Sequence, residues 1–254
     1  PAGGYGRIRR MPTPFMHLRL VAPLLAAADN WLPPATARLL VGYRGPFLLG
    51  STAPDVHNIS AVSRWETHFY PIPPDPRRPS LATMMAEWPA LAHPDGLPPG
   101  QAAFVAGYLA HLWFDEFWHL HIILPYYLSC VEWGDLSCRF DLYNVLLGYL
   151  DLRDRIQLGA SIGADLLTTE PTGWLPFVPD EDLVAWRDYL AAQLQPGAPT
   201  RTADILARRT HLTPGDFAGF ITDEERIRRE VLTHTPAEAI AQVYADGLAG
   251  AAAV

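Results

Sequence analysis

Prolines divide this chain into short segments, and this division limits what the chain can fold into. The sequence contains 25 prolines among 254 residues. A proline ends or kinks a helix and removes a hydrogen-bond donor from a strand. The segments between the prolines lack the alternation of apolar and polar residues that marks a half-buried strand. We therefore expect an all-α protein, built as a multi-helix bundle without internal repeats.

Prolines and glycines also delimit the expected helices. A helix over 14–29 contains Pro23, which predicts a kink or an early end. A long helix over 101–124 follows a Pro-Pro-Gly stretch, and a second one over about 136–168 is expected to break near Gly159 or Gly163. Further helices are expected over 34–41, 81–92 with Ser80 as its N-cap, 181–195, 202–210, 213–234 and 236–252.

The chain reads as a single domain over 11–254, with a core over 11–170 and a helical C-terminal subregion over about 178–254. Residues 1–10 are interpreted as an N-terminal extension. Arginines ahead of an apolar stretch give the N-terminus a loose likeness to a secretion signal, but His17, Arg19 and Pro23 interrupt that stretch. We expect a cytoplasmic protein without a transmembrane segment, because no apolar run reaches about 20 residues.

The composition excludes several classes of function. All 19 basic residues are arginine. Without lysine the chain can form neither a Schiff base nor a Walker phosphate-binding loop. The net charge of −8 argues against binding to nucleic acids, which depends on neutralising phosphates. Recognition of an anion would rest on arginine, backbone amides or a metal ion.

One expected helix combines ionisable side chains with aromatic surroundings. His111, Asp115 and His119 are each four residues apart, so they would share one face of the helix. A histidine and an aspartate one turn apart can bind the same divalent cation. The neighbouring residues are apolar, and an inward-facing Asp115 needs a cation or hydrogen-bond donors. A histidine–aspartate hydrogen bond without a metal is the simpler alternative.

Four short pieces along the first half of the chain occur in a recognisable order. They are Met16-His17, the run Phe47-Leu48-Leu49-Gly50-Ser51-Thr52-Ala53-Pro54-Asp55, Arg64 with Thr67-His68-Phe69, and Gly107-Tyr108-Leu109-Ala110-His111-Leu112-Trp113-Phe114-Asp115. Together they resemble the zinc-dependent phospholipase C family over about residues 11–125. That family shares an all-helical, multi-zinc fold with the S1/P1-type nucleases. The resemblance implies this fold and a zinc-dependent hydrolase that cleaves a phosphate ester with a metal-activated water.

The resemblance also implies a set of metal ligands. Asp55, His68, His111 and Asp115 would surround one zinc. Asp115 would also bridge to a second zinc, which His17 would bind.

A further family histidine follows the aspartate by six residues, and His121 has that spacing. His119 has the better position if the helix runs straight, so both stay candidates. The chain departs from the family in that no tryptophan precedes Trp31, and the next histidine after His121 is the distant His211. One to three zinc ions, or other divalent metals, are therefore expected.

Other residues are candidates for chemistry at such a site. Asp55 is a candidate both as a ligand and as the base that contacts the attacking water. Arg64 would contact an anionic substrate or orient a ligand. The aromatic residues Trp113, Phe114 and Trp118 would line a pocket for a small-molecule or lipid phosphate ester, or belong to the core.

The sequence leaves other functions open. One is an enzyme of the same fold that acts on a non-phospholipid substrate in small-molecule biosynthesis. Another is a non-catalytic helical protein with a structural metal, because four protein ligands close a tetrahedral site. A third is a serine hydrolase, since residues 159–163 match Gly-x-Ser-x-Gly around Ser161, a motif that requires a preceding strand. His57 is an alternate ligand or a surface residue.

Overall fold

The computed structural model describes residues 12–130, 132–199 and 201–254. No strand occurs in these ranges, which confirms the all-α prediction. The expected extension over 1–10 lies outside them. The α-helices are α1 (Pro14–Ala26), α2 (Ala28–Trp31), α3 (Pro34–Gly42), α4 (Arg44–Gly50), α5 (Arg64–His68), α6 (Ser80–Glu87), α7 (Pro99–Trp118), α8 (Leu136–Leu167), α9 (Asp180–Gln193), α10 (Thr202–Ala207), α11 (Pro214–Thr222), α12 (Glu224–Glu230) and α13 (Ala237–Ala251).

Shorter helical elements connect several of these helices. They are the 3₁₀ turns η2 (Ala53–Asn58), η3 (Pro89–Ala92) and η4 (Pro94–Gly96), and the π-helix η5 (His119–Leu128). Among the described residues, no helix is both long enough and apolar enough to cross a membrane.

Prolines mark where many of the helices begin. The first turns of α1, α3, α7 and α11 contain a proline, a position where its missing N–H costs no helical hydrogen bond. Helix α1 continues through Pro23 and ends at Ala26. Helix α8 leaves helical geometry at Gly159 (φ 70°, ψ 167°), which confirms the predicted break at that residue.

Three helix predictions were wrong in detail. The helix expected over 213–234 is two helices, because Asp223 is extended and its carboxylate caps α12. The helix expected over 81–92 begins at Ser80, with Pro79 as its N-cap, and it ends at Glu87, ahead of the separate 3₁₀ turn η3. The helix expected over 101–124 changes from α to π geometry after Trp118, and Pro125 lies inside the π segment.

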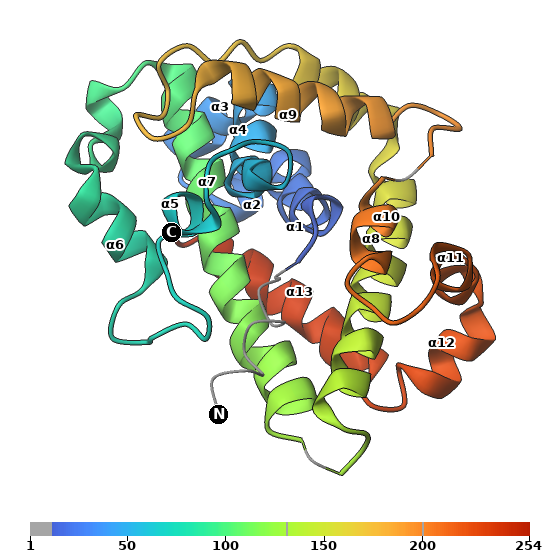
Figure 1. Cartoon of the computed structure of the whole chain (residues 1–254). Coiled ribbons are helices and arrows are strands. Elements are labelled where there is room, and N and C mark those ends of the chain that lie inside the picture. Colours follow the sequence, from blue (N-terminus) through green and yellow to red (C-terminus); the bar gives the residue numbers. More distant parts are fainter. Residues whose placement is uncertain (1–11, 131, 200) are drawn as a thin grey trace.

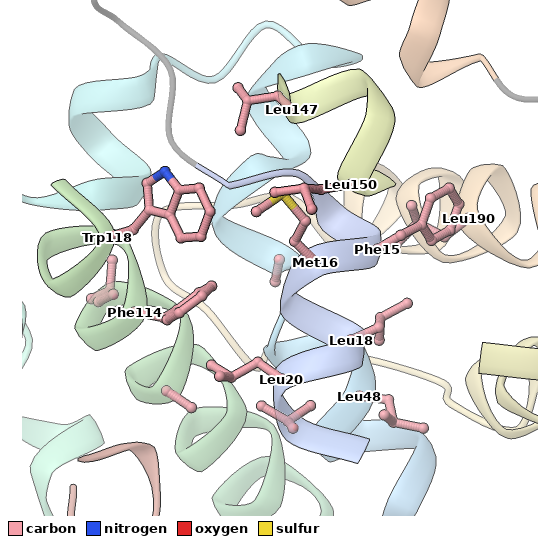
Figure 2. Close-up of a cluster of buried hydrophobic side chains, with 14 of the residues drawn as sticks. Phe15, Met16, Leu18, Leu20, Leu48, Phe114, Trp118, Leu147, Leu150 and Leu190 are labelled. Atoms are coloured by element: carbon pink, nitrogen blue, oxygen red, sulfur yellow. The ribbon is translucent and has the colours of Figure 1, made fainter. Parts of the chain in front are cut away.

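Helix α7 runs through the middle of the molecule (Figure 1), where α4 and α13 pack against it. Helix α1 packs on α8, and α9 contacts α8 and η2. The core lies where these helices meet. Figure 2 shows side chains of α1 beside α7, α4, α8 and α9 in one cluster; those labelled are Phe15, Met16, Leu18, Leu20, Leu48, Phe114, Trp118, Leu147, Leu150 and Leu190.

Two glycines allow the backbones of α4 and α7 to touch. A Cβ atom on Gly50 would lie 1.9 Å from the Phe104 carbonyl oxygen, and one on Gly107 would lie 2.1 Å from the Phe47 carbonyl oxygen. Neither position therefore tolerates a side chain without backbone movement. This contact brings the end of α4, and the turn η2 that follows it, against the middle of α7.

Candidate metal centre

Six ionisable side chains meet where α1, η2, α5 and α7 come together. Three overlapping groups have ligand atoms within 4.8 Å of one another, namely His17 with Asp55 and His111, Asp55 with His57 and His68, and His68 with His111 and Asp115. Each group could hold a metal ion. The structure thus brings together the five residues expected from the sequence as a core ligand set, and it adds His57.

Helix α5 is short because both of its ends are specified locally. At its N-terminus, Ser63 and Glu66 form a capping box in which each side chain accepts from the other's backbone N–H. At its C-terminus, Phe69 adopts a left-handed conformation (φ 59°) that ends the helix. His68 is therefore fixed as the last helical residue, and the chain reverses so that Tyr70 also points into the site.

Asp115 is the centre of the cluster. It is fully buried, at 0% exposure. Its Oδ1 lies 3.3 Å from His17 Nε2, and its Oδ2 lies 3.5 Å from His68 Nε2 and 3.7 Å from His111 Nε2. Ligands bound 2.0–2.1 Å from a tetrahedral zinc are about 3.3 Å apart. The separations around Asp115 are therefore close to those of ligands that share one ion.

Hydrogen bonds at the outer ring nitrogens assign the tautomers of two histidines. His111 Nδ1 lies 3.0 Å from the Ser51 carbonyl oxygen, which can only accept. His68 Nδ1 lies 2.9 Å from Thr67 Oγ1, whose own hydrogen is donated to the Arg64 carbonyl oxygen. Both Nδ1 atoms must therefore donate, so that the Nε2 atoms of His68 and His111 present lone pairs to Asp115.

In this arrangement the hydrogen-bond acceptors of the histidines face the acceptor oxygens of Asp115. His111 Nε2, Asp115 Oδ1 and His17 Nε2 are buried and have no hydrogen-bond partner among the described residues. The rings of His17 and His111 stack with centroids 3.7 Å apart. Unpaired buried polar atoms are costly, and a cation between His111 Nε2, Asp115 Oδ1 and His17 Nε2 would satisfy these three atoms.

Burial suppresses the charges that could otherwise balance the cluster. It lowers the pKa of His17 to about 3 and holds the pKa of His68 and His111 well below their usual range. Burial also raises the pKa of the Asp115 carboxyl, against the opposing effects of His111 and Arg64. The histidines are thus neutral near pH 7, which is the form that binds a metal.

Arg64 and Tyr70 support Asp115 from one side. Arg64 Nη2 donates to the Tyr70 hydroxyl over 2.6 Å, and that hydroxyl donates to Asp115 Oδ2 over 2.8 Å. The guanidinium lies over the Tyr70 ring, 4.6 Å from its centroid, and 3.7 Å from Asp115 Oδ2. Arg64 therefore has the geometry of a residue that orients a ligand, one of its two expected roles.

A small cavity opens beside the cluster. Its volume is about 50 Å³, enough for a few water molecules. Asp55, His57, Arg64 and His68 line one side, and residues of the C-terminal part line the other, namely Trp186, Tyr189, Thr202, Ile205, Leu206 and Arg209. Asp55 is thus the carboxylate of the cluster that reaches the cavity, while Asp115 lies behind it.

The two candidate histidines that follow Asp115 do not join the cluster. His119 is buried in the first turn of η5, and burial lowers its pKa to about 4. His121 is exposed and its ring packs against Phe117, with centroids 4.1 Å apart. The change from α to π geometry after Trp118 alters which side chains share a face, so the spacing of a straight helix no longer applies.

The three aromatic residues expected to line a substrate pocket lie elsewhere. Phe114 and Trp118 are completely buried and pack against Tyr244 of α13. The Trp113 indole donates to the Gly247 carbonyl oxygen over 3.3 Å. These residues therefore join α7 to α13 in the core, and Phe114 contacts the site only through the edge of the His17 ring.

For several residues of the site, no pattern in the sequence predicts that they belong to it. Tyr70 is placed by the reversed turn at Phe69, and Ser51 acts through its backbone carbonyl. The cavity residues of α9 and α10 depend on tertiary packing, including the Trp186 indole that donates to the Thr52 carbonyl oxygen over 2.9 Å. For His57, its position two residues after Asp55 was the available signal.

The serine-hydrolase alternative finds no support in the structure. Ser161 is exposed within α8, and no strand precedes it among the described residues.

Comparisons with family models, with curated proteins and with solved structures were made, and nothing in any of the three matches this chain.

Proposed function

We propose that this protein is a metal-dependent hydrolase of phosphate esters, with a fold of the zinc-dependent phospholipase C and P1 nuclease type. The observation that carries the proposal is the buried Asp115, whose Oδ2 faces the Nε2 lone pairs of His68 and His111 and whose Oδ1 lies 3.3 Å from His17 Nε2. Imidazole and carboxylate ligands suit zinc and related divalent ions.

The residues of the site would bind the metal and accept the proton. His17, Asp55, His68, His111 and Asp115 would hold one or two ions, and a bound ion would supply a Lewis acid that favours deprotonation of water and neutralises phosphate oxygens. Asp55 would accept a proton at its carboxylate, because it is the ligand-set carboxylate that borders the cavity.

Two arginines support an anionic substrate. Arg64 and Arg209 both border the cavity, and Arg209 Nε is buried without a hydrogen-bond partner among the described residues. Guanidinium groups bind phosphate oxygens through charge-assisted hydrogen bonds. The small volume of the cavity suits the phosphate of a compact ester better than the acyl chains of a phospholipid, so we expect small-molecule phosphate esters to be the substrates.

Metal analysis of three purified proteins tests the site. Wild type, His111→Ala and His211→Ala are incubated with zinc, freed of unbound metal, and measured by elemental mass spectrometry. His211 is the control because it is a histidine outside the cluster that pairs with Asp141. We expect at least one zinc per chain in wild type and His211→Ala, and a loss of metal in His111→Ala. Folded wild-type protein that holds no metal would overturn the proposal.

Activity is measured on the same samples with bis(p-nitrophenyl) phosphate, p-nitrophenyl phosphate and p-nitrophenylphosphorylcholine. We expect hydrolysis that a chelator removes and zinc restores, with His111→Ala inactive. Arg209→Gln is expected to raise KM more than it lowers kcat, because Arg209 borders the cavity but is not among the proposed ligands. Tightly bound zinc with no hydrolysis of any ester would instead support the structural-metal alternative.

A further inference from the structure

A second cavity lies between α1, α8 and α13, and it shares no lining residue with the cavity beside the metal centre. Its volume is about 520 Å³, within the range of small-molecule sites. Most of its lining is apolar, from Leu20, Pro23, Leu150, Leu232, Ile240 and Leu248. The polar lining comes mainly from Arg19, Arg153, Asp154 and two tyrosines. A predominantly apolar cavity with a few convergent polar groups is the usual form of a ligand site.

The two arginines have unused capacity. Arg19 Nε donates to Gln157 over 3.0 Å, and Arg153 Nη1 donates to the Tyr149 hydroxyl over 2.7 Å. Among the described residues, neither guanidinium is within ion-pair distance of a carboxylate, unlike Arg44, Arg187 and Arg226. Both therefore keep free N–H donors at the cavity, although their charges also act on the Asp154 carboxyl.

The acidic group in the cavity is already satisfied. Asp154 is 7% exposed, and its Oδ2 accepts a hydrogen bond from the Tyr244 hydroxyl. Burial raises the pKa of Asp154 to about 6. Glu224, which does not line the cavity, accepts from the hydroxyl of the lining residue Tyr149 over 2.9 Å. With Asp154 ionised, the ionisable lining still carries one net positive charge, in a protein whose overall charge is −8.

We propose that this cavity binds an amphiphilic anion, with a carboxylate or phosphate headgroup between Arg19 and Arg153 and an aliphatic chain over Leu20, Ile240 and Leu248. Charge complementarity selects the headgroup, because the cavity offers two guanidinium groups with free N–H donors. The aliphatic lining favours an aliphatic chain, because removing each methylene from water is favourable. This site is independent of the metal centre.

Titration calorimetry at pH 7.5 tests the proposal with four ligands of equal chain length: decanoate, decyl phosphate, decanol and decylamine. We expect saturable binding of at least one anion, with one site per chain. Decanol and decylamine should bind at least tenfold more weakly. Binding of decanoate alone assigns a carboxylate ligand, and binding of decyl phosphate alone assigns a phosphate ligand; either result supports the site. Equal binding of all four compounds would overturn it.

Variants locate the binding. Arg19→Gln and Arg153→Gln should each weaken binding of the anion about tenfold, the loss expected for one hydrogen bond to a charged group. Asp154→Asn should strengthen it severalfold, because the amide still accepts from Tyr244 but no longer repels the anion. Ala241→Trp should block the cavity.

Arg228→Gln is the matched control, since Arg228 is exposed and does not line the cavity. Circular dichroism confirms that each variant is folded. Unchanged affinity in both arginine variants would overturn the proposal.

Discussion

Two sets of buried carboxylates differ in the groups that face them, although burial acts on both in the same direction. Among the described residues, Asp115 accepts one hydrogen bond, from the Tyr70 hydroxyl, and otherwise faces the Nε2 lone pairs of His68 and His111. On α8, Asp154 accepts from the Tyr244 hydroxyl, and the hydroxyls of Thr13 and Thr202 oppose the effect of burial on the pKa of Asp151. Hydroxyl groups can donate to a carboxylate, whereas lone pairs cannot.

The comparison shows that burial of an acid does not by itself indicate a metal site. A buried carboxyl surrounded by hydroxyls reaches a stable state by hydrogen bonding or by binding a proton. One surrounded by neutral imidazoles needs a cation to satisfy the ligand atoms on both sides. The donor set, and not the burial, therefore distinguishes the two regions.

The largest expected effect is that of Asp115→Asn compared with Asp151→Asn. Asp115→Asn removes the charge that the three histidines surround, so we expect it to abolish metal binding and any hydrolysis. Asp151→Asn makes the same chemical change at a carboxyl faced by hydroxyls, and should leave the metal content unchanged. Elemental analysis of both variants checks this. Equal metal loss in the two would remove the distinction between the regions.

The next effect concerns stability and pH at Asp151. Burial raises the pKa of Asp151 from 3.8 to about 7. The folded state therefore binds more protons than the unfolded chain between these values, and this carboxyl lowers stability as the pH rises through 7. The difference amounts to about 4 kcal/mol at pH 8.

Asp151→Asn should raise Tm at pH 8 and change it little at pH 4, because a neutral amide resembles the protonated acid. Thermal unfolding followed by circular dichroism at several pH values gives the result. An equal change in Tm at both pH values would contradict the assignment of this pKa.

A smaller effect is expected from Tyr70→Phe, which tests how much the hydroxyl that contacts Asp115 contributes to metal binding. The substitution removes the hydroxyl that joins Arg64 to Asp115. Loss of a group that orients a metal ligand typically lowers metal affinity about 10–100-fold. Competition with a chromogenic zinc chelator measures it. Tyr127→Phe is the control, because the Tyr127 hydroxyl instead accepts from Thr235; an equal loss there would indicate a general effect of the substitution.

The smallest effect is expected from Ser161→Ala. Ser161 is an exposed residue of α8, so the substitution should leave hydrolysis, metal content and Tm unchanged. A rate assay with the phosphate esters checks this expectation. A large loss of activity would favour a serine nucleophile over the metal centre.

Local patterns were sufficient to predict some of this molecule. The absence of alternating strand patterns between the prolines predicted the all-helical structure, and the spacing of His111 and Asp115 placed them on one helical face. His17, Asp55 and His68 were expected from a resemblance of short pieces, and the structure places their side chains in one cluster with His111 and Asp115. Their binding of a metal stays a prediction.

The remainder depends on contacts between distant segments. The π geometry after Trp118 turns His121 to the surface, and a regular period could not anticipate that change. Trp113, Phe114 and Trp118 join α13 because of packing between residues more than 100 positions apart. The cavity lining from α9 and α10 likewise has no local pattern that distinguishes Arg209 from a surface arginine.

The ligand set spans the chain from His17 to Asp115, and this span has a mechanical consequence. An ion bound there would be a cross-link that closes a loop of about 100 residues, in a protein whose two cysteines are both free. In the loop-closure description, a cross-link of that length removes about 4–5 kcal/mol of entropy from the unfolded chain. The ion would then be a reversible cross-link in the first half of the molecule. The free energy of unfolding of that half would depend on the concentration of free metal.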